Sequence, residues 1–442
     1  MEKIYSPGEK IKNIRKDLKL KQVDITDRKI TRNLVSAIEN NKANLTKKTA
    51  ITIVHTINKY CKENDIDFNI TLDYIMESKS SQAIKLVNKY INELNLEKDN
   101  LYENLNDIDE LLLIITDNKE KSIILEKIGD ILLNNKLYLK AFNYYTKTFE
   151  NLLLSHDKIK LSEIYFKLGK TCLFLKEYTQ SIYFNKNAIS LLKTQDTIDP
   201  KLYIKCNFNL ALGLVKLKKY EKAIDILNKL EKSNITLNNK QKINILVLKG
   251  NTYSYINDYD NALICYEECI KLAEDKSLNK LLSLIYINVA AVYEKLQEYQ
   301  KSLDYTLLTL DLIKKYDRES LPETYYALGK LYISLKEYDK AKTYLTRPLL
   351  GYEYNIDNEL LIKIYLQLLK LHKITKSFKD IYALISIVES KFDLESSTKD
   401  IPKSKVELFY LNAIEFLFDK DQLTTKRLFD NLKRGKEKNE TN

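Results

Sequence analysis

The chain is 442 residues long, with 44% apolar residues and a formal net charge of +11 at pH 7. The apolar share is enough to bury a continuous core, but the apolar runs are far shorter than the roughly 20 residues of a membrane-spanning helix, which excludes a membrane protein. Residues 1–10 lack the apolar centre of a secretory signal, so we expect a cytoplasmic protein.

The basic surplus is concentrated at the N-terminus. Residues 1–62 contain 15 Lys and Arg and 6 Asp and Glu, a net charge of +9, which leaves only +2 for the rest of the chain. A basic segment on a near-neutral body is the electrostatic footprint of a nucleic-acid-binding domain. The alternative is a degenerate three-helix cap that binds nothing, and the local charge argues against it.

The apolar spacing in this segment predicts four short helices. They cover residues 7–18, 20–26 and 30–42, and the fourth begins after Thr46 with Ile53, Val54 and Ile57 on its core face. Thr31 is a good N-cap for the third helix. That helix should turn Val35 and Ile38 inward, and its outward residues are Arg32, Asn33, Ser36 and Ala37.

Residues 7–62 resemble the phage-repressor helix-turn-helix, the XRE or Cro/C1 class. The pattern of that class runs L-T-Q-x-x-L-A, then G-I-S-x-x-x-I-S-x-x-E-x-G. The matching residues here are Leu20, Gln22, Ile25, Ile30, Thr31, Val35, Ser36 and Glu39. The chain departs from the pattern at Lys21, Lys29 and Asn41, and Asn at the last position tolerates a left-handed turn.

The resemblance implies a DNA-binding surface on the third helix. Arg32, Asn33 and Ala37 would meet base edges, with Ser36 on the same outer face. Arg can bind a guanine edge with two hydrogen bonds, and Asn an adenine edge. The residues expected at phosphates are Gln22, Thr31, Asn40 and Lys42.

We expect residues 1–70 to form the helix-turn-helix domain, which we call the head. Residues 71–117 are expected to form linker and capping helices. One apolar stripe predicts a single linker helix from Thr71 or Ser81 to Leu94. A second stripe predicts a helix from Leu101 to Ile115, which would pair with the linker helix and cap the first of the helices beyond it.

Residues 325–345 hold the unit on which most of the chain is built. Tyr325, Leu328 and Tyr332 share one helix face with Gly329 beside them, and Ala341 and Leu345 come next on a second helix. This helical hairpin is similar to a tetratricopeptide repeat, whose pattern is W-x2-L-G-x2-Y, then A-x3-F.

The same pattern recurs to give seven copies. The positions that correspond to Gly329, which we call anchors, are Gly129, Gly169, Ala211, Gly250, Ala290, Gly329 and Leu369. Successive anchors are 40, 42, 39, 40, 39 and 40 residues apart, a regularity that indicates a stacked array. The sequence therefore predicts an all-α protein, with the array over residues 118–434 and a disordered tail over 435–442.

The first helix of each hairpin should line the concave side of such an array. A polar groove there suits an extended peptide, because an Asn carboxamide both donates to and accepts from a backbone amide. The expected groove residues are Asn209, Lys249, Asn251, Tyr255, Asn288, Lys330 and Lys370. The alternative, for any one Asn, is an ordinary solvated side chain.

Head and array together, over residues 7–420, resemble the RRNPP family of peptide-responsive transcription regulators in Gram-positive bacteria. The resemblance implies a homodimer that binds a double-stranded DNA operator and a short quorum-sensing peptide in its groove. Some relatives lack the head, so an alternative is a repeat scaffold that binds a response regulator, with the head secondary. A regulator with an empty groove is a third possibility.

Nothing in the sequence points to catalysis. The three His residues stand in unrelated contexts, and P-loop, dinucleotide-binding and nucleophile-elbow glycine patterns are absent. The five Cys residues show no metal-site spacing beyond Cys265 and Cys269, one helical turn apart, and are expected to be buried free thiols. We expect no enzyme, no cofactor and no metal.

Overall fold

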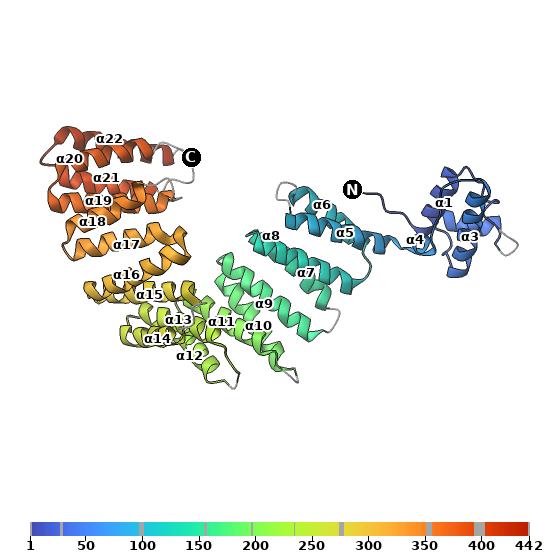
Figure 1. The fold of residues 1–442 in the computed structure, drawn as a ribbon, viewed down its shortest axis with the longest axis horizontal. Helices are drawn as coiled ribbons and strands as arrows, with labels where there is room; N and C mark the ends of the chain where they lie inside the picture. Colours follow the sequence, from blue (N-terminus) through green and yellow to red (C-terminus); the bar gives the residue numbers. More distant parts are fainter. Residues whose placement is uncertain are drawn as a thin grey trace. The chain divides into compact units, whose positions relative to one another are not determined.

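The computed structural model describes residues 2–26, 30–96, 101–153, 157–195, 198–233, 235–273, 278–350, 356–392 and 403–440. Those residues form 22 α-helices and no strand, so the all-α prediction is confirmed (Figure 1). The chain divides into two compact units, Met1–Lys219 and Tyr220–Asn442, and each is described by itself. In the described part of the chain, no helix is long and apolar enough to cross a membrane.

The head is built from α1 (Pro7–Asp17), α2 (Arg32–Glu39), α3 (Lys47–Glu63) and α4 (Leu72–Met76). Thr31 and Thr46 cap α2 and α3 as predicted, because their side chains accept hydrogen bonds from backbone N–H groups in the first turns. Ile70 and Ile75 pack into the head core, so the head extends past residue 70. The fully buried centre of that core is Ile11, Ile25, Val35, Ile53, Ile57 and Ile75.

The predicted helix over residues 20–26 is wrong. This segment forms turns, in which the Asp24 N–H donates to the Lys21 carbonyl at 3.0 Å and the Thr26 N–H donates to the Val23 carbonyl at 3.1 Å. The Asp24 carboxylate also accepts from the Lys21 N–H at 2.6 Å. Local side-chain-to-backbone bonds of this kind compete with helix formation, and here they decide the conformation. Ile25 is still buried, as the motif requires.

Of the two predicted starts of the linker helix, Thr71 is wrong and Ser81 lies within two residues of the observed start, because the chain turns at Glu77. Glu77 has extended backbone with ψ 121°, and it separates α4 from α5 (Lys79–Leu96). The second linker prediction is confirmed: α6 (Leu101–Ile114) packs against α5, and both share a core with the first hairpin.

All seven predicted hairpins are present, and an eighth comes after them. The last pair was not predicted, and α22 continues to Glu440 where residues 435–442 were expected to be a disordered tail. The helices are α7 (Asn118–Asn134), α8 (Tyr138–Leu153), α9 (Lys158–Phe174), α10 (Tyr178–Lys193), α11 (Pro200–Lys216), α12 (Tyr220–Glu231), α13 (Asn239–Tyr255), α14 (Tyr259–Leu272), α15 (Asn279–Lys295), α16 (Tyr299–Tyr316), α17 (Leu321–Ser334), α18 (Tyr338–Thr346), α19 (Asn358–Thr375), α20 (Phe378–Lys391), α21 (Lys403–Leu417) and α22 (Gln422–Glu440).

The glycine anchors make room for the residue 16 positions later. A Cβ on Gly129 would lie 2.6 Å from the Tyr145 ring, and a Cβ on Gly250 would lie 2.7 Å from the Tyr266 ring. Where the anchor is Ala290, the residue 16 later is the smaller Thr306. In these three hairpins a larger anchor is therefore matched by a smaller closing residue.

In each of the seven hairpins, the residue seven positions after the anchor has left-handed backbone conformation and forms the turn. Its φ lies between 54° and 64°, and it is never Gly. The next N–H donates back to the carbonyl three positions after the anchor, for example Glu337 to Tyr332 at 2.9 Å, which is the Schellman ending of a helix. These residues are Lys136, Lys176, Lys218, Asn257, Gln297, Lys336 and Lys376.

Candidate functional site

The outer face of α2 presents the side chains that were predicted to meet DNA bases. Arg32 and Asn33 are exposed in its first turn, Ser36 and Ala37 are half-buried, and Thr31 caps the helix. Beyond its end, Lys42 is also exposed. The structure therefore brings the predicted polar groups to one end and one side of a short helix, on the most basic part of the chain.

The buried carboxylate of Glu39, the last residue of α2, holds this helix in place within the head. Glu39 is 2% exposed and accepts from Arg15 Nε at 2.5 Å, from Arg15 Nη2 at 2.9 Å and from Gln22 Nε2 at 2.8 Å. Burial alone would raise the pKa of Glu39, but the hydrogen bonds from Arg15 and Gln22 hold it below its ordinary value. The network joins α1, the 20–26 turn and α2.

Two residues that were predicted to contact phosphates also make hydrogen bonds within the head. One N–H of the Gln22 carboxamide donates to Glu39, and the group carries a second N–H donor. Asn40 donates to the Ser36 carbonyl at 2.9 Å and accepts from Lys12 at 3.1 Å, both within the head. Arg15 was missed by the sequence reasoning, although its partner Glu39 was recognised as part of the motif. Lys29 lies outside the described residues.

Two of the predicted groove residues have an unsatisfied donor. Asn209 on α11 and Asn288 on α15 are half-buried, and the side-chain N–H group of each is shielded from solvent without an acceptor among the described residues. A buried donor left unpaired costs about 1–3 kcal/mol, so each position favours an incoming carbonyl oxygen. Each lies two residues before its anchor, in separate units.

The remaining predicted groove residues differ in availability. Lys249 is mostly buried and pairs with Glu231 at 2.5 Å. Asn251 accepts from the Tyr266 hydroxyl at 2.5 Å, and Lys330 pairs with Glu294 at 2.8 Å. Tyr255 is exposed and stacks on Tyr220, and Lys370 is exposed.

The sequence reasoning missed an apolar stripe on α15. Leu284, Ile287 and Ala291 are exposed at steps of three and four residues, so they share one face of α15. Ile287 and Ala291 border a cavity of about 400 Å³ between α15, α16 and α17, which Thr306 and Thr324 also line. The sequence did contain a signal for this stripe, because these apolar residues stand outside the positions that pack within a repeat.

The model of the family described as tetratricopeptide repeat matches residues 243–276 and 322–347. The chain contains tetratricopeptide repeats.

Similar curated proteins include response regulator aspartate phosphatase A of Bacillus subtilis (strain 168), which is 22% identical over 52% of this chain and 50% of its own length. The chain spans about half the length of such relatives or less. Among solved structures, the apo form of the quorum sensor NprR from B. thuringiensis aligns with TM-score 0.52 and 17% identity, over 79% of this chain and 97% of its own. A signal-transduction ATPase with a tetratricopeptide-repeat sensor, PH0952 from Pyrococcus horikoshii, aligns with TM-score 0.50 and 15% identity, over 90% of this chain and 57% of its own. These likenesses show the fold.

Proposed function

We propose that this chain is a cytoplasmic, DNA-binding transcription regulator, not an enzyme, and that its repeats bind a short signalling peptide that alters operator binding. The observation that carries the proposal is the combination of a basic head, which exposes Arg32 and Asn33 on α2, with a repeat fold similar to that of a quorum sensor. A homodimer would present two such heads to two half-sites of one operator.

The repeats support the peptide half of the proposal through their unpaired amides. An extended peptide offers backbone carbonyls at a regular rise of about 3.3 Å per residue. One carbonyl would satisfy the buried N–H group of Asn288, and beside it the α15 stripe of Leu284 and Ile287 would take apolar side chains. Asn209 offers the same donor in its own unit.

The test is native mass spectrometry of the full chain purified from its host, in search of a bound peptide of about five to ten residues. Calorimetry with that peptide then compares the parent with Asn209→Ala and Asn288→Ala. Asn261→Ala is the matched control, because Asn261 is exposed on a second helix. We expect both variants to weaken peptide binding at least tenfold and the control to leave it unchanged. Equal affinity in all four proteins would refute the groove assignment.

A second candidate is a repeat scaffold that binds a response regulator. The sequence match to response regulator aspartate phosphatase A favours it. The two candidates differ in what the head does. Arg32→Ala should abolish the sequence preference of a DNA regulator and leave the binding of a scaffold to its protein partner unaffected.

A further inference from the structure

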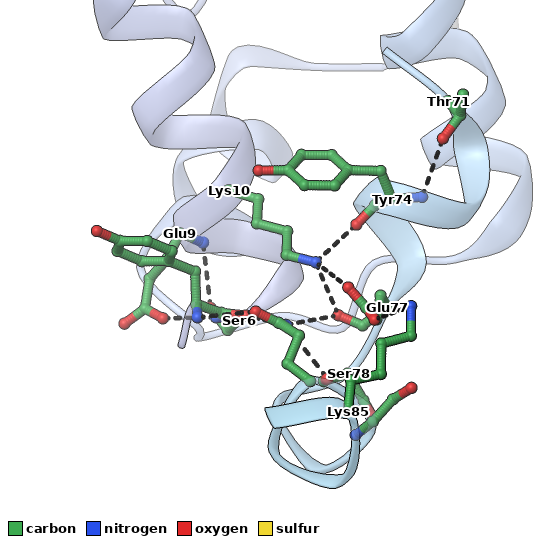
Figure 2. Close-up of polar contacts among 11 residues, drawn as sticks. Ser6, Glu9, Lys10, Thr71, Tyr74, Glu77, Ser78 and Lys85 are labelled. Carbon is green, nitrogen blue, oxygen red and sulfur yellow. Dashed lines mark hydrogen bonds and ion pairs between the residues drawn. The ribbon is translucent and has the colours of Figure 1, made fainter. Parts of the chain in front are cut away.

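The junction between the head and the repeats contains a buried lysine. Lys10 on α1 is 3% exposed, and its ammonium group donates to the Tyr74 carbonyl at 2.7 Å and pairs with the Glu77 carboxylate at 3.1 Å (Figure 2). The Tyr74 ring lies beside it, with the ring centroid 4.5 Å from Nζ. A buried charge is tolerated only where it is paired and hydrogen-bonded, so Lys10 holds α1 against the end of α4. We call Lys10, Tyr74 and Glu77 the Lys10 corner.

The contacts of Lys10 lie at the break between α4 and α5. In a continuous helix, the Tyr74 carbonyl would accept from the N–H of residue 78. Here it accepts from Lys10, 64 residues earlier in the chain, and Glu77 turns the backbone toward α5. Glu77 also pairs with Lys85 on α5 at 2.7 Å. The ammonium groups of Lys85 and Lys10 hold the pKa of Glu77 below its ordinary value.

The N-terminal residues make a second set of contacts between the head and α5. In residues 2–5, which we call the strap, the Tyr5 carbonyl accepts from the Gln82 amide at 2.8 Å and Glu2 pairs with Lys89 at 2.7 Å. Just after the strap, Glu9 pairs with Lys79 at 2.9 Å. The three α5 partners are three and seven residues apart, so they share one face of that helix.

The other face of α5 belongs to the repeats. Ala83, Val87 and Ile91 are buried in a core shared with α6, α7 and α8, and Ile4 of the strap packs against the same core. One helix therefore carries the head on one side and the start of the repeats on the other.

We propose that the Lys10 corner and the 2–5 strap together form the coupling device of this protein: they fix the head to α5, so that a displacement of α5 within the repeats reorients the head. Lys10, Glu77 and Gln82 are positioning residues in this scheme. Its regulatory meaning rests on the proposed function, but the fastening itself does not.

The experiment measures the head orientation directly in the full chain. Spin labels are attached at Lys48→Cys on α3 and Lys127→Cys on α7, two exposed positions. The five native thiols are buried, and burial raises the pKa of Cys172 and Cys206 to about 12, so the introduced thiols react first. Pulsed electron paramagnetic resonance then gives the distribution of distances between the labels.

We expect a single narrow distribution in the parent. Lys10→Met keeps an unbranched side chain but removes its ammonium group. This variant and deletion of residues 2–5 should each broaden the distribution, and the combined variant should broaden it most. Lys16→Met is the control, because Lys16 is exposed on the same helix. If the combined variant keeps the parent distribution, the proposal is overturned.

Two further outcomes are informative. If Lys10→Met fails to fold, the strap deletion still decides, because it leaves the head core intact. If the distances broaden as expected but the parent binds no DNA, the fastening stands and the proposed function fails.

Discussion

Gly250→Ala adds one methyl group where the structure has no room for it. The new Cβ would lie 2.7 Å from Cε1 and 2.8 Å from Cζ of Tyr266. That ring cannot move aside easily, because it is 1% exposed and its hydroxyl donates to Asn251 at 2.5 Å. Overpacking of this kind costs about 1–3 kcal/mol, whereas replacing Gly by Ala in a helix gains about 1 kcal/mol. We therefore expect a net loss of about 0–2 kcal/mol in the free energy of unfolding.

The matched control is Gly213→Ala on α11. There the nearest heavy atom to a new Cβ is Ile182 Cγ1 at 3.1 Å, farther away than the Tyr266 ring is at Gly250. This variant should be neutral or slightly stabilised. Urea unfolding followed by circular dichroism compares both variants with the parent.

A second substitution tests whether the Tyr266 ring is the cause of the destabilisation. Gly250→Ala with Tyr266→Thr imports the Ala290 and Thr306 pair of the fifth repeat. The double variant should be more stable than the sum of the two single effects predicts, by about 0.5–3 kcal/mol, because the two sites share one volume. A Gly250→Ala protein more stable than the parent, or strict additivity, would refute the reasoning.

The other predictions concern a turn, the DNA face and the buried carboxylate. Lys336→Gly should raise the free energy of unfolding by up to about 1 kcal/mol, because Gly adopts a φ of 63° without steric cost; Lys336→Ala should give no gain in the same urea titration. Arg32→Ala should cost about 1–3 kcal/mol on the operator and little on random DNA, whereas Lys42→Ala should weaken both and lower the salt slope by about one; equal loss on all sequences in a filter-binding assay would contradict the first assignment. The pKa of Glu39 is lower in the folded head, so its contribution to stability is present above its unfolded pKa of about 4.3 and is lost as pH falls through the folded value. Glu39→Gln should therefore be less stable than the parent at neutral pH and approach it in acid, as hydrogen exchange in α2 would report; a gap independent of pH would contradict this.

Local pattern was enough wherever the packing partners are close in sequence. The two helices of each hairpin meet within about 16 residues, so the anchor at Gly329 and the closing Leu345 already define the contact, and the spacing repeats it along the chain. The caps Thr31 and Thr46 act within three residues, and they too were predicted. The last hairpin escaped because α21 and α22 do not carry the repeat's small-residue pattern.

The sequence by itself therefore determined the class of the protein, the register of its repeats and the residues on the outer face of α2. Only the tertiary structure decided where the linker breaks, because the group that takes the Tyr74 carbonyl is Lys10, which reaches it from another helix. The same holds for Lys249, which pairs with Glu231 of the preceding repeat, and for Gln22, which is drawn to Glu39. A side chain's face can be read from helical periodicity, but its partner depends on which distant residue the fold places within hydrogen-bonding distance.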